Sequence, residues 1–107
     1  VYAVRGAPVI NDATVEDAEY VGMNEVARVV SNGFDAASTV LSESSDEFRK
    51  LFYEADLIIS KGQGNLEGLI HMNDRRIFFL LMVKCNVVAE FLKVEKDSFV
   101  TLNFGHV

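Results

Sequence analysis

The chain has 107 residues, of which 50% are hydrophobic, and it carries a formal net charge of −6 at pH 7. This apolar content is enough for a folded core and argues against disorder, while the acidic excess argues against a general nucleic-acid binder, which normally shows a basic stripe. The single cysteine, Cys85, excludes an intramolecular disulfide and fits a reducing, cytoplasmic setting, and the longest apolar run, residues 77–83, is too short to span a membrane.

Strand and helix patterns alternate along the whole chain. Capping boxes open the first two expected helices, Thr14 with Asp17 and Ser44 with Glu47. The connections are too long for hairpins, so the sequence predicts βαβ units that form an α/β domain with a mostly parallel sheet and helices on both faces. In chain order, the expected elements are a strand at 2–5, a helix at 14–21, a strand at 27–31, a helix at 44–55, a strand at 56–60, a helix at 66–70, a strand at 77–83, a helix at 86–92 and a strand at 99–103.

Polar residues gather where the expected strands end. The carboxyl ends of parallel strands lie along one edge of a sheet, and open α/β folds bind ligands at that edge, so we expect the site there. The residues at this edge are Asn11 and Asp12 after the first strand, Asn32 and Gly33 after the second, 61–65 after the third, 84–86 after the fourth, and Asn103 and His106 after the fifth.

The segment Lys61-Gly62-Gln63-Gly64-Asn65 is the sharpest local signal. Its two glycines allow a tight turn with bare N–H groups, and a helix start follows, which is typical of an anion-binding cradle. Lys61 adds a point charge suited to a phosphate oxygen. The spacing is not that of a Walker loop, and the alternative is an ordinary glycine-rich turn with a surface lysine.

Asn11 and Asp12 form a second candidate site, between Pro8 and an expected helix cap. The carboxylate could bind a hard divalent cation, and the amide could place substrate or water. The alternative is that one of these two residues merely caps the helix that begins near Thr14. The residues alone leave both interpretations open.

Four separated segments resemble motifs of one protein family, the damage-control phosphatases, which is also described as an ARMT-like metal-binding domain. The segments are residues 9–18, 30–33, 56–69 and 77–85, in the expected order, so the likeness covers essentially the whole chain. The resemblance implies a three-layer, Rossmann-like fold in which residues 1–107 form the C-terminal α/β part of a metal-dependent phosphatase domain. It also implies a mostly helical domain, which is expected upstream of this chain.

The resemblance implies hydrolysis of phosphate monoesters of small metabolites with a divalent cation such as Mn²⁺, Co²⁺, Ni²⁺ or Mg²⁺. By position, Asp12 matches a metal-binding aspartate and Lys61 matches a lysine that contacts substrate phosphate, so both are expected to be catalytic. The family's other metal ligands, an adjacent Asp-Asn pair, are expected upstream, and this chain alone would then be inactive. The substrate-binding residues that we expect are Asn11, Asn32, Gly33, Lys61, Gly62, Gln63, Gly64 and Asn65.

Other functions stay open from the sequence. A non-catalytic phosphometabolite-binding or regulatory module, or a catalytically incomplete fragment, would keep the phosphate cradle without competent metal ligands. A dinucleotide-binding domain is disfavoured, because no Gly-x-Gly-x-x-Gly follows the first strand. The expected partners are a small phosphorylated metabolite, the remainder of the same protein and, through an exposed sheet edge, a second copy of the chain. Neither nucleic acid nor a membrane is expected as a partner.

Overall fold

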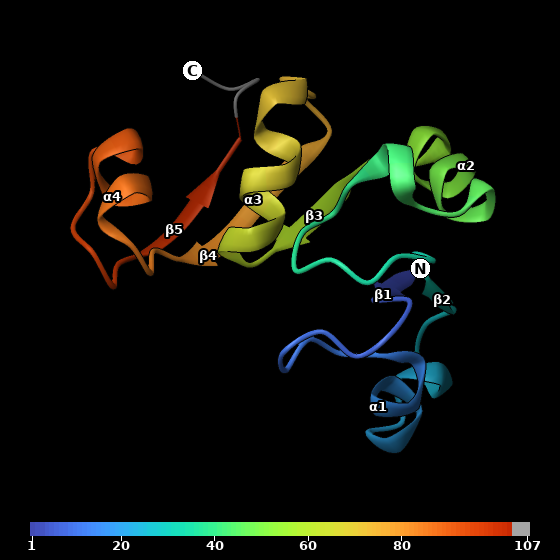
Figure 1. Ribbon diagram of the computed structural model, residues 1–107. Helices are drawn as coiled ribbons and strands as arrows, with labels where there is room; N and C mark the ends of the chain where they lie inside the picture. The colour runs from blue at the N-terminus through green and yellow to red at the C-terminus, as the bar shows by residue number, and fades with distance from the viewer. Residues whose placement is uncertain (104–107) are drawn as a thin grey trace. The chain divides into compact units, whose positions relative to one another are not determined.

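The computed structural model describes residues 1–103, and within them the chain is an α/β protein with four α-helices and two small sheets (Figure 1). The chain divides into two units, Val1–Ala55 and Asp56–Val107. Its helices and strands are β1 (Tyr2–Val4), α1 (Val15–Tyr20), β2 (Val29–Ser31), α2 (Asp46–Glu54), β3 (Ile58–Lys61), α3 (Gln63–Leu69), β4 (Ile77–Met82), α4 (Asn86–Leu92) and β5 (Phe99–Leu102).

Some sequence-based expectations go beyond this architecture. A single sheet with helices on both faces, the predicted three-layer arrangement, is not shown. His106, expected at the ligand-binding edge, lies outside the described residues. None of the helices in residues 1–103 combines the length and the hydrophobicity that a membrane span requires.

The first unit is built on two short parallel strands. β1 pairs with β2, and the chain crosses between them through α1 and a 3₁₀ turn. The predicted capping box of α1 is confirmed, because the Asp17 carboxylate accepts hydrogen bonds from the backbone N–H of Thr14 at 2.9 Å and from its hydroxyl at 3.0 Å. Val4, Ala18 and Val30 are buried and form the small core between the strands and this helix.

Helix α2 is capped one residue later than the sequence predicted. Ser45, not Ser44, is the N-cap, and its hydroxyl accepts a hydrogen bond from the N–H of Phe48 at 3.1 Å. The hydroxyl of Ser44 is already used, because it donates to the carbonyl of Val40 at 2.8 Å. Phe48 and Phe52 are buried, as their helical spacing predicted.

The second unit contains a three-stranded sheet in the order β3-β4-β5. β3 and β4 run parallel and are joined by α3, which packs against both strands, so the predicted βαβ unit is confirmed for this pair. Side chains alternate along β4, where Ile77, Phe79 and Leu81 are buried and Leu80 is exposed. The core of this unit therefore lies on one face of the sheet, together with the buried side of α3.

The prediction of a parallel fifth strand is wrong, because β5 runs antiparallel to β4. Val83, directly after β4, donates to the carbonyl of Ser98 at 2.9 Å and accepts from the N–H of Asp97 at 2.7 Å. The chain thus returns alongside the end of β4 and pairs with it in the opposite direction. Asn103 consequently lies at the start of β4, where its side-chain amide donates to the carbonyl of Ile77 at 2.6 Å. Its expected place beside the carboxyl ends of β3 and β4 is therefore also wrong.

An ion pair closes the turn before β4. The Asp74 carboxylate accepts hydrogen bonds from the backbone N–H of Arg76 at 2.9 Å and from its guanidinium at 2.7 Å. The side-chain hydrogen bond to Arg76 is the main reason why the pKa of Asp74 lies below its ordinary value. Because the folded pKa is lowered, the pair stabilises the fold above the ordinary pKa, and this stabilisation is lost as the pH falls through the lowered one.

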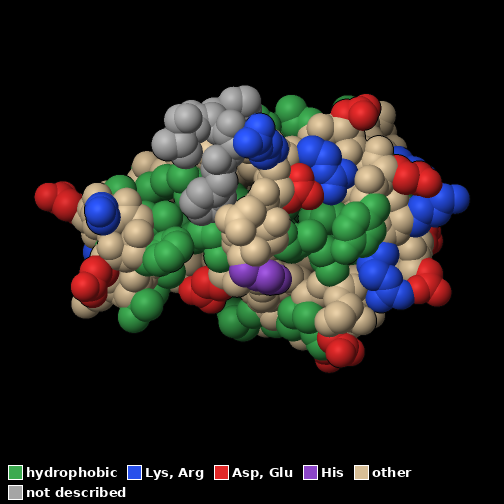
Figure 2. All heavy atoms as spheres, turned by 90° about the horizontal axis from the view of Figure 1, so that it is seen from above, with side chains coloured by type: hydrophobic (Ala, Val, Ile, Leu, Met, Phe, Trp, Pro, Cys, Tyr) green, Lys and Arg blue, Asp and Glu red, His purple; other side chains and the backbone are tan. Residues whose placement is uncertain are grey.

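The other face of the second sheet exposes apolar side chains. By strand register Ile59, Leu80 and Phe99 share this face, and they are 62%, 39% and 85% exposed. Figure 2 shows hydrophobic side chains, in green, at the molecular surface. We call these three side chains the open face. Exposed apolar patches of this kind are typical of surfaces that associate with other surfaces.

The 107-residue chain expressed alone is expected to self-associate through the open face, because association removes apolar area from water at about 25 cal/mol per Å². Light scattering at rising concentration should show masses above the 11.9 kDa of one chain. Phe99→Thr should shift the chain toward the monomer, whereas Tyr20→Gln, which removes an exposed aromatic ring in the first unit, should not. A strictly monomeric unaltered chain at high concentration would contradict this expectation.

Candidate functional site

Lys61 is the last residue of β3, and its side chain is exposed at the carboxyl end of the strand. It lies opposite Leu80 of β4, and the N–H of the next residue, Gly62, donates to the carbonyl of Leu80 at 2.8 Å. The strand ladder therefore continues into the predicted anion cradle and takes up one of its backbone donors. The cradle keeps the first N–H groups of α3, which have no acceptor within the helix.

Gly62 turns the chain from β3 into α3. Its φ of 97° lies in a region that only glycine adopts readily, and it serves as the N-cap of α3. A Cβ at this position would meet no atom within 4 Å. The need for glycine is therefore set by the backbone conformation and not by lack of space.

Gly62→Ala is expected to lower the free energy of unfolding by about 1–3 kcal/mol, the usual cost of holding a non-glycine residue in such a conformation. Chemical denaturation of the variant and the unaltered chain measures this difference. Because the added methyl group has free space, an unchanged stability would mean that the turn relaxes to another conformation. That result would contradict a fixed geometry for Lys61 and the start of α3.

Two further residues of the predicted cradle hold the turn in place. The Gln63 side chain accepts a hydrogen bond from the backbone N–H of Lys84 at 2.7 Å, and it donates to Cys85 Sγ at 3.5 Å. The Asn65 side chain donates to the carbonyl of Lys61 at 2.7 Å. These contacts connect the start of α3 to the loop after β4. Direct contact of Gln63, Gly64 or Asn65 with a substrate stays a prediction.

An open hollow of about 440 Å³ lies at this end of the second sheet. Lys61, Gly62 and Gln63 line it together with Lys84, and its apolar wall includes Leu80 and Phe99. No aspartate, glutamate or histidine is among the described residues that line it. We call it the cationic hollow. Its chemistry suits the binding of an anion, but it holds no obvious base or nucleophile for hydrolysis.

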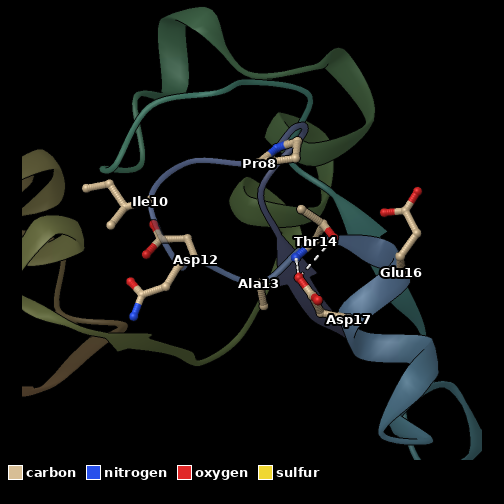
Figure 3. A pocket seen from close by; sticks show the side chains of 8 residues that line it. Pro8, Ile10, Asp12, Ala13, Thr14, Glu16 and Asp17 are labelled. Carbon is tan, nitrogen blue, oxygen red and sulfur yellow. Dashed lines mark hydrogen bonds between the residues drawn. The ribbon is translucent and has the colours of Figure 1, made fainter.

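The other candidate, Asp12, lies in the first unit on the loop between β1 and α1. Its carboxylate accepts a hydrogen bond from Arg5 Nε at 2.9 Å, and the Arg5 side chain is 10% exposed against 35% for that of Asp12. Asn11 and Asp12 line a pocket of about 620 Å³. In Figure 3 Asp12 lies on the loop, whereas Asp17 lies on α1 with its carboxyl group turned to Thr14.

Residues 1–103 do not by themselves form a metal site. They contain no group of three or more histidine, cysteine, aspartate or glutamate side chains placed to hold an ion. Near Asp12, the carboxylate of Asp17 already caps α1, and Asp12 itself is paired with Arg5. Divalent ions such as Mg²⁺ and Ca²⁺ take six or more oxygen ligands, often with several waters, so one paired carboxylate does not fit the requirement.

The chain alone is therefore expected to bind Mn²⁺ no more tightly than about 0.1–1 mM, the range of weak carboxylate sites. Isothermal titration of the 107-residue chain with MnCl₂ measures this affinity. Asp12→Asn should then leave the weak binding almost unchanged, since no ligand set depends on it. A Kd below about 1 µM that is lost in Asp12→Asn would show instead that the chain holds a complete site.

Asn32 and Gly33 join the end of β2 to the start of α2. Asn32 is 4% exposed, and its side-chain oxygen accepts from the N–H of Phe34 at 3.0 Å. Gly33 has a φ of 78°, and a Cβ on it would approach Cβ of Ser45 to 2.8 Å. Both residues thus have structural roles in the first unit. Their expected contact with a substrate stays a prediction.

Sequence reasoning assigned no role to two residues that the geometry brings forward. Lys84 lines the cationic hollow with Lys61, and its position directly after the fourth strand was the signal that could have identified it. Arg5 pairs with Asp12. Its signal was weaker, because only its place at the end of the first strand distinguishes it from other arginines.

Comparisons with known proteins agree with one another. Residues 1–100 match the family described as "Damage-control phosphatase ARMT1-like domain". The chain is 47% identical over 100 residues to a damage-control phosphatase of Pyrococcus horikoshii, 43% over 105 to an uncharacterized protein of Methanocaldococcus jannaschii, and 41% over 98 to a damage-control phosphatase of Archaeoglobus fulgidus. These matches cover 94%, 95% and 91% of this chain but 35%, 34% and 34% of the relatives.

A solved structure gives the same result. The crystal structure of a DUF89 family protein from Pyrococcus horikoshii matches with a TM-score of 0.90 and 46% sequence identity. The match covers 94% of this chain and 35% of that one. The chain thus spans about a third of the length of the curated relatives that it matches.

Proposed function

Because the chain belongs to the damage-control phosphatase ARMT1-like domain family, we propose that the protein that carries it hydrolyses phosphate monoesters of small metabolites with the help of a divalent metal ion. Two of the relatives are named damage-control phosphatases. The observation that carries the proposal beyond the family name is Lys61, which lies at the carboxyl end of β3 in a hollow lined by no acidic side chain.

In this proposal Lys61 binds and orients the phosphoryl group. A phosphate monoester carries a charge of about −1.5 to −2 at pH 7, and its oxygens are strong hydrogen-bond acceptors. The lysine ammonium supplies a positive charge near the oxygens on which negative charge is redistributed in the transition state. Gly62 and Gln63 fix the base of this side chain, because their hydrogen bonds tie the turn to the end of β4 and to the loop that follows it.

The metal ion of this proposal is Mn²⁺, Co²⁺, Ni²⁺ or Mg²⁺, and Asp12 is its proposed ligand in this chain. Such an ion, when bound, polarises phosphoryl oxygens and orients the attacking group. The residues described here supply only one carboxylate, which is paired with Arg5. We therefore assign the remaining ligands to the polypeptide outside these 107 residues and the activity to the whole protein, and we derive no step through the ion from this chain.

A second candidate function is a module that binds phosphorylated metabolites without hydrolysing them. The composition of the cationic hollow favours it, since lysines are present but no carboxylate or histidine is among its described lining residues. The two candidates share Lys61 as the anion-binding residue. They differ in whether the protein releases inorganic phosphate.

The experiment that separates them is a phosphatase screen of the complete protein. A panel of sugar phosphates, phosphopantetheine-type compounds and nucleotides is incubated with Mn²⁺, Co²⁺, Ni²⁺ or Mg²⁺ singly, and with EDTA as the control. Metal-dependent release of phosphate from at least one class of monoester is expected. A folded protein that binds these compounds yet releases no phosphate with any of the four ions would support the binding module instead.

A further inference from the structure

A second lysine shares the cationic hollow with Lys61. Lys84 follows β4, the strand parallel to β3, so that both strands end in a lysine at the same edge of the sheet. Both side chains are exposed. Within residues 1–103, the ion pairs of the structure involve arginines and not these two lysines. The hollow therefore carries two positive charges without a neighbouring carboxylate among its described lining residues.

The backbone at Lys84 is held on both sides. Its N–H donates to the side-chain oxygen of Gln63 at 2.7 Å, and Gln63 stands in the first turn of α3, two residues after Lys61. The preceding residue, Val83, is fully buried and exchanges hydrogen bonds of 2.9 Å and 2.7 Å with the return strand. The bases of the two lysines are thus fixed relative to each other, while their long stems let the ammonium groups adjust to a ligand.

We propose that Lys84 is a second phosphoryl-binding residue and that the Lys61–Lys84 pair selects dianionic phosphate monoesters over monoanionic phosphodiesters. The inference rests on the proposed function, since it concerns the substrate of the same site. A monoester carries two negative charges above its second pKa, which is about 6, whereas a diester carries one. Two unpaired lysines match the first charge state and are in excess for the second.

The test measures binding without turnover. The complete protein is titrated with phenyl phosphate and with its diester, methyl phenyl phosphate, at pH 7.5 in EDTA, by isothermal calorimetry or NMR. Lys84→Met is expected to weaken phenyl phosphate binding about tenfold, the usual effect of one charge-assisted hydrogen bond, and to change diester binding little. Lys84→Arg should retain the preference, and unfolding midpoints should confirm that all variants fold.

Lys96→Met is the matched control, since Lys96 is an exposed lysine of the same unit that does not line the hollow. It should leave both affinities unchanged. Phenyl phosphate binding to the unaltered protein should also strengthen as the pH rises through about 6, where the monoester becomes a dianion. Unchanged discrimination in Lys84→Met, or no detectable phenyl phosphate binding to the unaltered protein, would overturn the inference.

The outcome is distinguishable from failure of the proposed function. If no monoester is hydrolysed but binding still depends on Lys84, hydrolysis is wrong and the two-lysine site stands. If monoesters are hydrolysed and Lys84→Met keeps the kcat/KM of the unaltered protein, the phosphatase stands and the role of Lys84 is wrong.

Discussion

Lys61→Met is expected to lower kcat/KM for phosphate monoester hydrolysis by the complete protein by about 10²–10³-fold, the size of effect seen when one donor to a developing negative charge is removed. Methionine keeps the length of the stem and removes the charge. Because the ammonium group faces charge that changes during phosphoryl transfer, most of the loss should appear in kcat, with a smaller rise in KM.

Initial rates with phenyl phosphate across a range of concentrations, at saturating Mn²⁺, provide the measurement. Lys96→Met serves again as the control for loss of a surface charge. Lys61 is exposed and stands at a strand end, so its replacement should leave the unfolding midpoint close to that of the unaltered protein. A variant that folds and turns over at the unaltered rate would show that the lysine is only the surface residue of a glycine-rich turn.

Asp12→Asn is expected to reduce metal-dependent hydrolysis by more than about 10²-fold, because replacing a ligand should cost at least as much as replacing its supporting partners. The substitution removes the charge but keeps an oxygen that can accept the hydrogen bond from Arg5. It therefore separates the proposed metal role from the structural role of the ion pair. Asp12→Ala would remove both, and would leave the nearly buried Arg5 without this partner.

Phosphate release as a function of Mn²⁺ concentration measures the effect of Asp12→Asn. Glu16→Gln is the matched control, since Glu16 is an exposed carboxylate that lines the same pocket. The control should retain the activity and the metal dependence of the unaltered protein. Undiminished turnover of an aryl phosphate by Asp12→Asn with Mn²⁺ or Co²⁺ would refute the role of Asp12.

Local patterns predicted the elements of the fold well, because they depend on residues close in sequence. The capping box of Thr14 and Asp17 was confirmed, as was the helical spacing of Phe48 and Phe52. The cap of α2 was misplaced by one residue. Both serines have the same capping chemistry, and only the hydrogen bond from Ser44 to an upstream carbonyl decides between them.

The direction of β5 could not be predicted from such patterns. It depends on the backbone hydrogen bonds of Val83 with Asp97 and Ser98, which join residues far apart in the sequence. For the same reason, the predicted edge was right for Lys61 and wrong for Asn103. An edge inferred from strand ends holds only where the strands run parallel.

The candidate site shows the same division. The sequence identified Lys61 and the glycine that turns the chain after it, but it did not show that the Gly62 amide pairs with β4 or that Gln63 binds the backbone of Lys84. These contacts depend on the pairing of β3 with β4. Metal ligation by Asp12 came from the family resemblance, and the ion pair with Arg5 became visible only in the structure.

The central claim is that Lys61 contacts a phosphoryl group while Asp12 ligates a metal ion in the same active site. A crystal structure of the complete protein with Mn²⁺ and orthophosphate tests it most directly. We predict Lys61 Nζ at about 2.8 Å from a phosphate oxygen and the Asp12 carboxylate bound to Mn²⁺. A phosphate and a metal ion bound together elsewhere, with neither side chain in contact with them, would contradict the account.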